Sequence, residues 1–396
     1  MTDKGVWDLQ DVRDKSLQGD WNYQTPDGPF TLWAWGNNGF PSNRNGMLGL
    51  NTITNMSSPV QVGTETTWKA VSASSYWTTA TKTDGTLWVW GSGYGGGYGL
   101  LGLNAGSQQF SSPTQIGTDT NWSRSHAAYQ NGMAVKTNGE LFVWGYGQEG
   151  AIGENSRTDR SSPVQIGTDT TWSSAKGHFV NGTNNASYAI KTDGTLWAWG
   201  INRQNGQLGL NDIADRSSPT QIGTKTNWSW VEIMSNVVLA VNTDGELWTW
   251  GYGSNGQLGL NQPTPTKISS PTQLPGTWSQ IGGHNTQVLG LKTDGTLWGW
   301  GSGGGGANND TVKRSSPTQI GTDTNWEGVA NGTVGGIKNN GTLWIWGSNY
   351  YGKLGLNQPY PGTSYSSPVQ LPGNYDAYNS WSCGYGRGVF AFKPIE

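Results

Sequence analysis

Large and small side chains alternate along one short segment of this chain, and that segment occurs seven times. It reads Leu-Trp-x-Trp-Gly, where x is a smaller residue. Alternation with a period of two residues predicts a β-strand, because successive side chains of a strand point to opposite faces of the sheet. The final glycines of the copies are Gly36, Gly91, Gly145, Gly200, Gly251, Gly301 and Gly347, and Phe142 replaces the first Trp of the third copy. Steps of 46 to 55 residues between these glycines indicate an internal repeat.

Further short patterns occupy fixed places in the repeats. Ser-Ser-Pro follows each pentapeptide and opens a second predicted strand, Pro-Thr-Gln-Ile-Gly, and a lone Trp follows in a third. A fourth run, such as residues 188–191, leads into Asp-Gly or Asn-Gly, which predicts a tight hairpin to the next pentapeptide. Four short strands in each repeat match the size of one propeller blade. The period of 3.6 that a helical solenoid needs does not occur in the repeats.

The two ends of the chain each hold half of one hairpin. The first pentapeptide, at residues 32–36, has no run before its turn, whereas the run at 388–393 has no pentapeptide after it. Pairing of these two segments closes a ring and leaves no open sheet edge there. We therefore predict an all-β fold, a seven-bladed β-propeller of four-stranded blades over residues 26–396, closed by pairing of the N-terminal and C-terminal strands. Residues 1–25 form a separate docking or capping segment.

Composition agrees with a β-protein whose core is built from indole rings. Glycine supplies 62 of the 396 residues and tryptophan 24, whereas only 33% of the chain is hydrophobic. So much glycine argues against a helical protein, since each one costs about 1 kcal/mol in a helix interior. Aromatic residues make up 12% of the chain, which argues against disorder. Of the 24 tryptophans, 20 lie in the pentapeptides or are the lone Trp that follows Ser-Ser-Pro.

Charge and cysteine usage limit the partners. The formal net charge is −3 and no basic run occurs, which argues against nucleic acid as a partner. No stretch approaches the roughly 20 apolar residues of a membrane span, so we expect no membrane insertion. The N-terminus lacks the apolar core of a signal peptide, which predicts synthesis in the cytoplasm. The single cysteine, Cys383, forms no internal disulfide.

The chain lacks the residue patterns of a catalytic site. Catalysis needs a converging acid, base, nucleophile or metal. His126, His178 and His284 fall in different repeats and outside any metal-binding spacing, and the recurrent Asp of Asp-Gly is explained by its turn. Glycine-rich segments at 91–99 and 301–306 lack the Lys-Ser/Thr ending of phosphate loops. We predict that the protein is not an enzyme and holds no cofactor or metal.

Tyrosines gather between each pentapeptide and the next Ser-Ser-Pro, which is also where repeat lengths vary most. Variable loops on a rigid scaffold are typical of recognition sites for glycans or proteins. The alternative is that each loop packs on its own blade or faces a neighbouring subunit. The candidate recognition residues are Tyr94, Tyr98, Tyr146, Tyr252, Tyr350 and Tyr351.

The order of motifs within a repeat carries a family resemblance. Gly-Gln-Leu-Gly-Leu-Asn at 206–211 and 256–261, then Ser-Ser-Pro-Thr-Gln-Ile or a close variant, then Asp-Gly and the pentapeptide, resembles the repeat of the regulator of chromosome condensation family. The resemblance covers about residues 26–396 and implies a seven-bladed propeller. It also implies protein partners such as a small GTPase, although the basic tail of the founding exchange factor has no equivalent here. The Gly-Gln-Leu-Gly motif is degraded at 150–153 and nearly absent around 306–308.

Residues 1–25 do not belong to the repeat. Their pattern Gly-Val-Trp-x-Leu-x-x-Val, followed by Gly-x-Trp, resembles short terminal segments of bacteriophage virion and tail-associated proteins, especially marine ones. The resemblance implies docking to another virion protein. Alternatively, Asp8 caps a two-turn helix through Leu17 that covers one face of the ring. The candidate docking residues are Trp7, Leu9, Val12 and Trp21.

Three functional hypotheses follow. The leading one is a non-enzymatic structural protein located in a bacteriophage virion, such as a tail, fibre or capsid-decorating protein, which binds other virion proteins and a host surface glycan or protein. The first alternative is a cellular propeller regulator that binds a GTPase or another protein. The second alternative is a glycan-binding lectin for host attachment.

Overall fold

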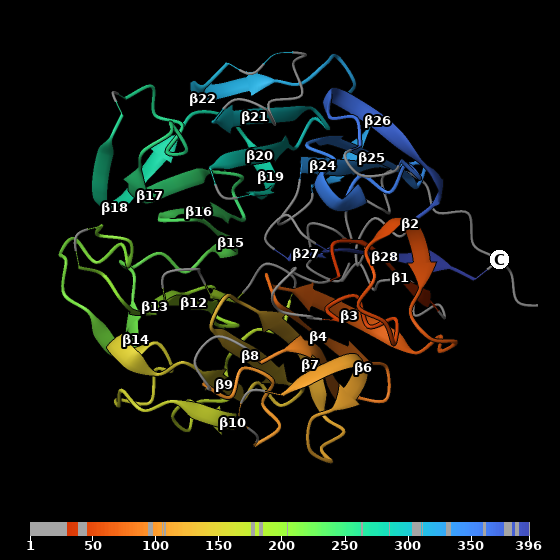
Figure 1. The fold of residues 1–396 in the computed structure, drawn as a ribbon. Helices are drawn as coiled ribbons and strands as arrows, with labels where there is room; N and C mark the ends of the chain where they lie inside the picture. Colours follow the sequence, from red (N-terminus) through yellow and green to blue (C-terminus); the bar gives the residue numbers. More distant parts are fainter. Residues whose placement is uncertain are drawn as a thin grey trace, which may run out of the picture.

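Seven four-stranded antiparallel sheets form a ring in the computed structural model (Figure 1). We number the blades from the sheet that contains the first strand of the chain. The strand orders, from the centre outward, confirm the predicted propeller of seven blades. The structure describes residues 30–38, 46–93, 98–104, 106, 108–175, 179–181, 185–203, 205–262, 264–284, 286–302, 310, 312–329, 334–358, 362–375, 382–384 and 388–395. The candidate docking residues Trp7, Leu9, Val12 and Trp21, and the helix expected at 8–17, lie outside these residues.

Each blade contributes one strand to each of four layers. The innermost strands, for blades 1 to 7, are β27 (Ser382–Gly384), β3 (Trp68–Ala73), β7 (Trp122–Ala127), β11 (Phe179–Asn181), β15 (Trp228–Met234), β19 (Trp278–His284) and β23 (Trp326–Val329). The second strands are β28 (Gly388–Pro394), β4 (Trp77–Lys82), β8 (Asn131–Lys136), β12 (Ala186–Ile190), β16 (Val237–Asn242), β20 (Gln287–Lys292) and β24 (Val334–Lys338).

The third strands carry the pentapeptides, and the outermost strands carry Ser-Ser-Pro. The third strands are β1 (Phe30–Gly36), β5 (Leu87–Ser92), β9 (Leu141–Gly145), β13 (Leu196–Gly200), β17 (Leu247–Gly253), β21 (Leu297–Gly301) and β25 (Thr342–Gly347). The outermost strands are β2 (Met56–Gln61), β6 (Gln109–Gln115), β10 (Arg160–Gln165), β14 (Arg216–Gln221), β18 (Thr266–Leu274), β22 (Arg314–Gln319) and β26 (Tyr365–Asn374). Two short 3₁₀ turns, η1 (Gln148–Gly150) and η2 (Tyr350–Gly352), follow β9 and β25.

The outermost strands begin earlier than the sequence pattern predicts. In blade 4 the strand starts at Arg216, before Ser-Ser-Pro, because its ladder with β13 resumes beyond a bulge and pairs Arg216 with Gly200. The strand ends at Gln221, since the Ile222 side chain turns into the core and is 2% exposed. The glycine that closes each pentapeptide lies beside this bulge. Gly251 has φ 99°, and a Cβ there would lie 2.1 Å from the Asn236 carbonyl oxygen.

Both ends of the chain build blade 1, as the sequence predicts. Strand β1 pairs with β28 along its whole length, from Phe30 opposite Pro394 to Gly36 opposite Gly388. The blade order is β2-β1-β28-β27, so two strands come from each end of the chain. The closure places the fully buried Phe390 and Phe392 in the core between blades 1 and 2. The ring is thus closed by the hydrogen bonds of one sheet.

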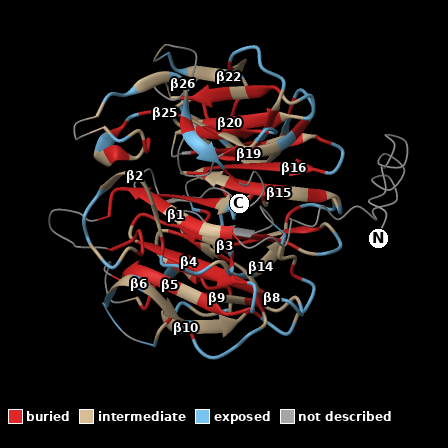
Figure 2. Cartoon of the chain, turned by 90° about the vertical axis from the view of Figure 1, so that its right-hand side faces the viewer, coloured by how far each residue is buried: buried red, intermediate tan, exposed pale blue. Residues whose placement is uncertain are grey.

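The core lies between the blades. Figure 2 shows buried residues along the middle strands, whereas outer strands such as β10 and β22 are only partly buried. The second tryptophan of every described pentapeptide is buried, and Trp250 is typical with no exposed surface. Its ring meets that of Trp228 edge to face, with centroids 6.5 Å apart. Burying one such ring removes about 150–250 Å² from water, which contributes about 4–6 kcal/mol before entropy is subtracted.

The Gly-x-Leu-Gly-Leu-Asn motif joins neighbouring blades in the described part of the chain. In blade 4 the carbonyl of Gln207 accepts the indole N–H of Trp250 from blade 5, at 2.7 Å. The backbone N–H of Asn211 then donates to the carbonyl of Ser269, at 2.7 Å, in the outer strand of blade 5. Gly209, with φ 71°, permits this approach, because a Cβ there would lie 2.8 Å from the Trp250 indole nitrogen. The motif is therefore a clip between blades.

The same clip occurs at six described junctions. The equivalent indole bonds run from Trp35 to Lys353, Trp90 to Met47, Trp144 to Leu100, Trp199 to Ala151, Trp250 to Gln207 and Trp300 to Gln257. Even the degraded copy at 150–153 keeps its bond, since a backbone carbonyl is the acceptor and Ile152 fills the place of the leucine. The seventh junction involves residues 303–309, which lie outside the described residues.

Candidate functional site

The ring has two faces with different chemistry. One face, which we call the turn face, carries the Asp-Gly hairpins between second and third strands and the links from one blade to the next. The opposite face, which we call the loop face, carries the hairpins between first and second strands and the loops between third and outer strands. This assignment follows from the antiparallel order within each blade.

Polar side chains on the turn face satisfy one another within four of the described blades. In the turn of blade 6 the carboxylate of Asp294 accepts hydrogen bonds from the backbone N–H of Thr296, at 3.0 Å, and from its hydroxyl, at 2.6 Å. The Thr296 oxygen in turn accepts the indole N–H of Trp298, at 2.8 Å. The same relay occurs at Asp84, Asp193 and Asn340. The recurrent Asp is therefore structural, as its turn position predicts.

A lysine covers the half-buried indole of most pentapeptides on this face. Lys82 Nζ lies 3.6 Å from the ring centroid of Trp88 and 4.8 Å from that of Trp68. The same ammonium forms an ion pair with Glu65, at 2.6 Å. Equivalent lysines lie over the corresponding rings at Lys136, Lys191, Lys292, Lys338 and Lys393. Each indole face thus receives an intramolecular cation.

Blade 5 exchanges the positions of these charges. Asn242 stands where the other repeats have lysine, and Lys225 stands where four of them have an acid, Glu65, Asp119, Asp169 or Asp323. Lys225 Nζ lies 4.8 Å from the Trp248 ring centroid and pairs with Glu246 at 3.2 Å. The cation over the ring is retained although its position in the sequence changes. Blade 5 therefore keeps a cation over the ring and a carboxylate beside that cation, with the residue types exchanged between positions.

Replacing Thr296 by valine will raise the pKa of Asp294. The Thr296 hydroxyl and then its backbone N–H hold the pKa of the Asp294 carboxyl below its ordinary value. A carboxyl with a lowered pKa stabilises the fold fully above its ordinary pKa, near 4, and loses that contribution as the pH falls through the lowered value. The stability difference between wild type and Thr296→Val will therefore shrink as the pH falls. A carboxyl pKa unchanged in an NMR titration of the variant would contradict this relay.

The loop face holds the predicted recognition residues. Tyr98 and Tyr146 come from blades 2 and 3, and their ring centroids lie 4.7 Å apart. Tyr350 and Tyr351 form a second pair, at 4.4 Å, in η2 of blade 7. The described contacts do not place Tyr252 beside either pair. Its ring is instead near a lysine, with Lys267 Nζ 5.4 Å from the ring centroid. Tyr94 lies outside the described residues.

Charged residues surround the Tyr98–Tyr146 pair. Burial raises the pKa of the Tyr146 phenol, and Glu149, Tyr98 and Asp159 raise it further, whereas Arg203 acts in the opposite direction. Arg203 reaches across from blade 4 and pairs with Glu149 at 2.5 Å and with Asp215 at 3.3 Å. Three consecutive blades therefore contribute charged or aromatic side chains to one part of the loop face.

Two large side chains on this face have a left-handed backbone conformation. Glu149 has φ 64° and Tyr351 has φ 61°, whereas most other non-glycine residues with positive φ are asparagines. This conformation costs large residues about 1 kcal/mol or more and is enriched at functional sites. Both residues directly precede the first glycine of a clip, where three other repeats have Asn45, Asn205 and Asn255. Alignment of the repeats would have revealed this signal, which our sequence analysis missed.

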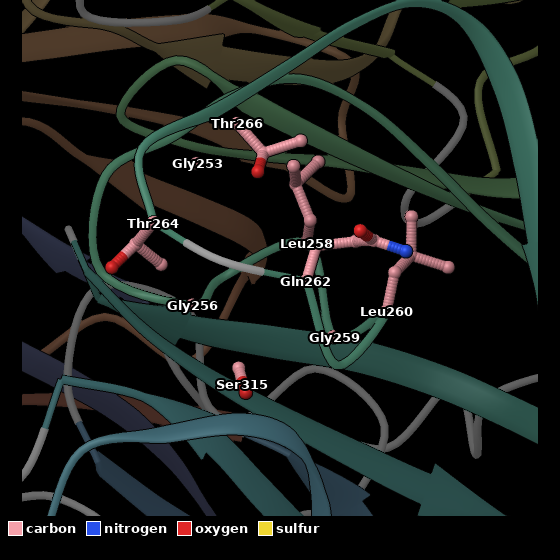
Figure 3. Close-up of a pocket in the computed structure, with 9 residues that line it drawn as sticks. All are labelled: Gly253, Gly256, Leu258, Gly259, Leu260, Gln262, Thr264, Thr266 and Ser315. Atoms are coloured by element: carbon pink, nitrogen blue, oxygen red, sulfur yellow. The ribbon is translucent and has the colours of Figure 1, made fainter.

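The described residues contain little that suggests small-molecule chemistry. The cavity in Figure 3, beside the clip of blade 5, has a volume of about 10 Å³, room for about one water molecule. Within the described part of the chain no three His, Cys, Asp or Glu residues gather around a common point. His126 Nδ1 contacts the Ser72 hydroxyl at 3.4 Å, between the inner strands of blades 2 and 3. No described helix is long and apolar enough to span a membrane.

Comparisons with known proteins identify the repeat. The Regulator of chromosome condensation (RCC1) repeat matches residues 193–238 and 244–289. The mitochondrial RCC1 domain-containing protein RUG3 of Arabidopsis thaliana is 29% identical over 43% of this chain and 39% of its own length. The ultraviolet-B receptor UVR8 of the same plant is 28% identical over 56% of this chain and 49% of its own length. The chain therefore spans less than half the length of these relatives.

A solved structure shares the whole ring. Prp20p of Saccharomyces cerevisiae superposes with a TM-score of 0.75 at 17% identity, covering 93% of this chain and 92% of that one. Identity at this level shows the fold alone. Together the comparisons show RCC1 repeats in a seven-bladed propeller, as the motif order predicts. They do not test the resemblance of residues 1–25 to virion proteins, which stays a prediction.

Proposed function

We propose that this chain is a protein-binding propeller, a rigid platform that recognises a protein partner without catalysing a reaction of its own. Its ring is similar to that of Prp20p, whose description names protein partners. The structure of Prp20p is described together with its binding properties to Gsp1p and histones. This similarity favours the cellular regulator over the virion component. Location in a virion, virion partners and glycan binding stay predictions.

The difference between the two faces carries this proposal. On the turn face, described carboxylates, threonines and lysines are largely engaged by neighbours in the same repeat. The loop face instead has loops of variable length, two tyrosine pairs and two strained residues, Glu149 and Tyr351. Tyr350 is 52% exposed, which is unusual for a large aromatic side chain. Tyrosine and arginine are enriched among the residues that dominate binding energy in protein interfaces.

Site-specific photo-crosslinking tests which face binds. In one variant a photo-reactive residue replaces Tyr350 on the loop face. In the matched control it replaces Thr322, an exposed residue on the turn face in the link between β22 and β23. In cells that make the protein, we expect a crosslinked protein partner from position 350 and none from position 322. The reverse pattern, or equal labelling at both positions, would contradict a loop-face interface.

Purified partners separate the functional hypotheses. A small GTPase loaded with a fluorescent nucleotide represents the partner class that the family resemblance implies, and core histones represent a partner named for Prp20p. Saturable binding of either class, with loss of affinity in Tyr350→Ala, supports the platform. Glycan-array binding that disappears in Tyr351→Ala, without protein binding, favours the lectin instead.

A further inference from the structure

Four tyrosines lie along the junction of blades 2 and 3 on the loop face. Besides the Tyr98–Tyr146 pair, Tyr76 and Tyr129 approach with ring centroids 5.7 Å apart. Tyr76 and Tyr129 lie in the hairpins that follow the innermost strands, so this pair is nearer the axis. All four side chains are partly exposed. We call Tyr76, Tyr98, Tyr129 and Tyr146 the tyrosine strip.

Backbone contacts hold the two pairs side by side. The N–H of Tyr146 donates to the carbonyl of Gln130, the residue after Tyr129, at 2.9 Å. Asn131 Nδ2 donates to the carbonyl of Tyr146 at 2.5 Å. Tyr76 and Tyr98 both pack on the buried cluster between blades 2 and 3, which includes Trp144. The tyrosine strip therefore rests on a rigid base and runs outward from the inner hairpins.

The outer end of the strip is acidic. The Asp159 carboxylate is held by the backbone N–H of Gly147 at 2.8 Å, and Glu149 lies in the adjacent 3₁₀ turn. Both raise the pKa of the neighbouring Tyr146 phenol, which indicates a negative potential at that ring. Arg203, whose side chain is 50% exposed, already pairs with Glu149 from the next blade. A guanidinium group is thus accommodated here.

We propose that the tyrosine strip binds an extended basic segment of a partner protein, with arginine or lysine side chains over the tyrosine rings and near Glu149 and Asp159. This inference rests on the proposed function. Cations are attracted to aromatic faces, and an extended segment presents its side chains at regular spacing. The turn face shows the same chemistry satisfied within the chain, where Lys82 lies between Trp88 and Glu65. In the proposed complex the partner supplies the cation over the tyrosine strip.

A pair of peptide probes tests the charge of the occupant. Fluorescein-labelled (Arg-Pro)₄ and (Glu-Pro)₄ peptides share an extended backbone and differ in the sign of their charge. Fluorescence anisotropy with the full chain at low salt is expected to show saturable binding of the arginine probe alone. Added salt weakens this binding, because part of the attraction is electrostatic. Equal binding of both probes, or binding of neither, overturns the proposal.

Matched variants locate the binding site. Glu149→Gln with Asp159→Asn keeps the hydrogen-bond acceptors but removes two negative charges, and we expect about tenfold weaker binding of the arginine probe. Tyr98→Ala with Tyr146→Ala is expected to weaken it about tenfold or more, whereas the corresponding double Phe variant, which keeps both rings, stays close to wild type. Thr322→Ala, at an exposed position on the turn face, is the control and leaves binding unchanged.

The outcomes distinguish this inference from the proposed function. Unchanged affinity in the Glu149→Gln, Asp159→Asn variant overturns the inference, and its unchanged melting temperature verifies that the variant is folded. If position 350 crosslinks to a protein but the arginine probe does not bind, the proposed basic segment is wrong, whereas the proposed protein-binding platform still stands. Glycan-array binding that is lost in the double Ala variant, without binding of the arginine probe, would assign the strip to a glycan.

Discussion

Deleting residues 388–396 is expected to abolish cooperative folding of the propeller. Strand β28 lies between β1 and β27, so its loss leaves two sheet edges unpaired and opens the ring. It also removes Phe390 and Phe392, which are fully buried. Each buried Phe contributes about 3–5 kcal/mol relative to Ala, and the whole stability of a domain is about 5–15 kcal/mol. Thermal denaturation followed by circular dichroism will show no sharp transition, and gel filtration will show aggregation.

Deleting residues 1–25 is the matched control for the opposite end. The first described strand begins at Phe30, so this deletion spares every described blade strand. We expect a melting temperature close to that of the full chain, which would also support the predicted boundary of the propeller. Phe392→Ala, expected to cost about 3–5 kcal/mol, tests closure in a chain that still folds. Closure would be unnecessary for stability if the chain without residues 388–396 melted like wild type.

Replacing Trp250 by alanine is expected to destabilise the fold by about 4 kcal/mol. The ring is completely buried between blades 4 and 5, and its N–H donates to the Gln207 carbonyl at 2.7 Å. The substitution therefore leaves a cavity and breaks the clip in one step. Trp250→Phe keeps most of the ring and loses the hydrogen bond, so we expect a smaller cost of about 1–2 kcal/mol. Urea denaturation measures the free energy of unfolding of each variant.

Trp248 is the internal control, two residues away in the same strand. Its ring is half-buried at the turn-face rim and is covered by Lys225. Trp248→Ala is expected to cost about 1–2 kcal/mol, less than Trp250→Ala, because solvent replaces part of the lost contact. Equal destabilisation by the two alanine variants would contradict a clip centred on Trp250.

The fold was predictable because the copied motifs mark where each repeat begins and ends. Seven pentapeptides predicted seven blades, and the half-hairpins at the two ends predicted the pairing of β1 with β28. The sequence pattern missed the start of the outer strands, because the ladder resumes beyond a bulge that single-strand alternation does not reveal. The sequence pattern identified Gly-x-Leu-Gly-Leu-Asn only as a family motif and did not predict its role as a clip. The groups that the motif contacts, such as Trp250 and Ser269, lie about 40–60 residues away in the next blade.

The candidate site was only partly predictable. Tyr98 and Tyr146 were named because they lie in loops of variable length, and the structure brings them together from neighbouring blades. Tyr76 and Tyr129 were missed because they lie in the short hairpins between first and second strands, not in the loops that follow the pentapeptides. The contribution of Arg203 depends on how blade 4 is placed against blade 3, and no local pattern encodes that placement.

The sequence by itself determined the local structure of this protein. Alternating large and small residues make strands, Asp-Gly makes hairpins, and the copied unit sets the number of blades, because these effects act within a few residues or by simple repetition. Only the tertiary structure decided which side chains meet across blade junctions. There the distances depend on the rotation of one blade against the next, and that rotation is set by the joint packing of buried indoles, close-approaching glycines and clip hydrogen bonds.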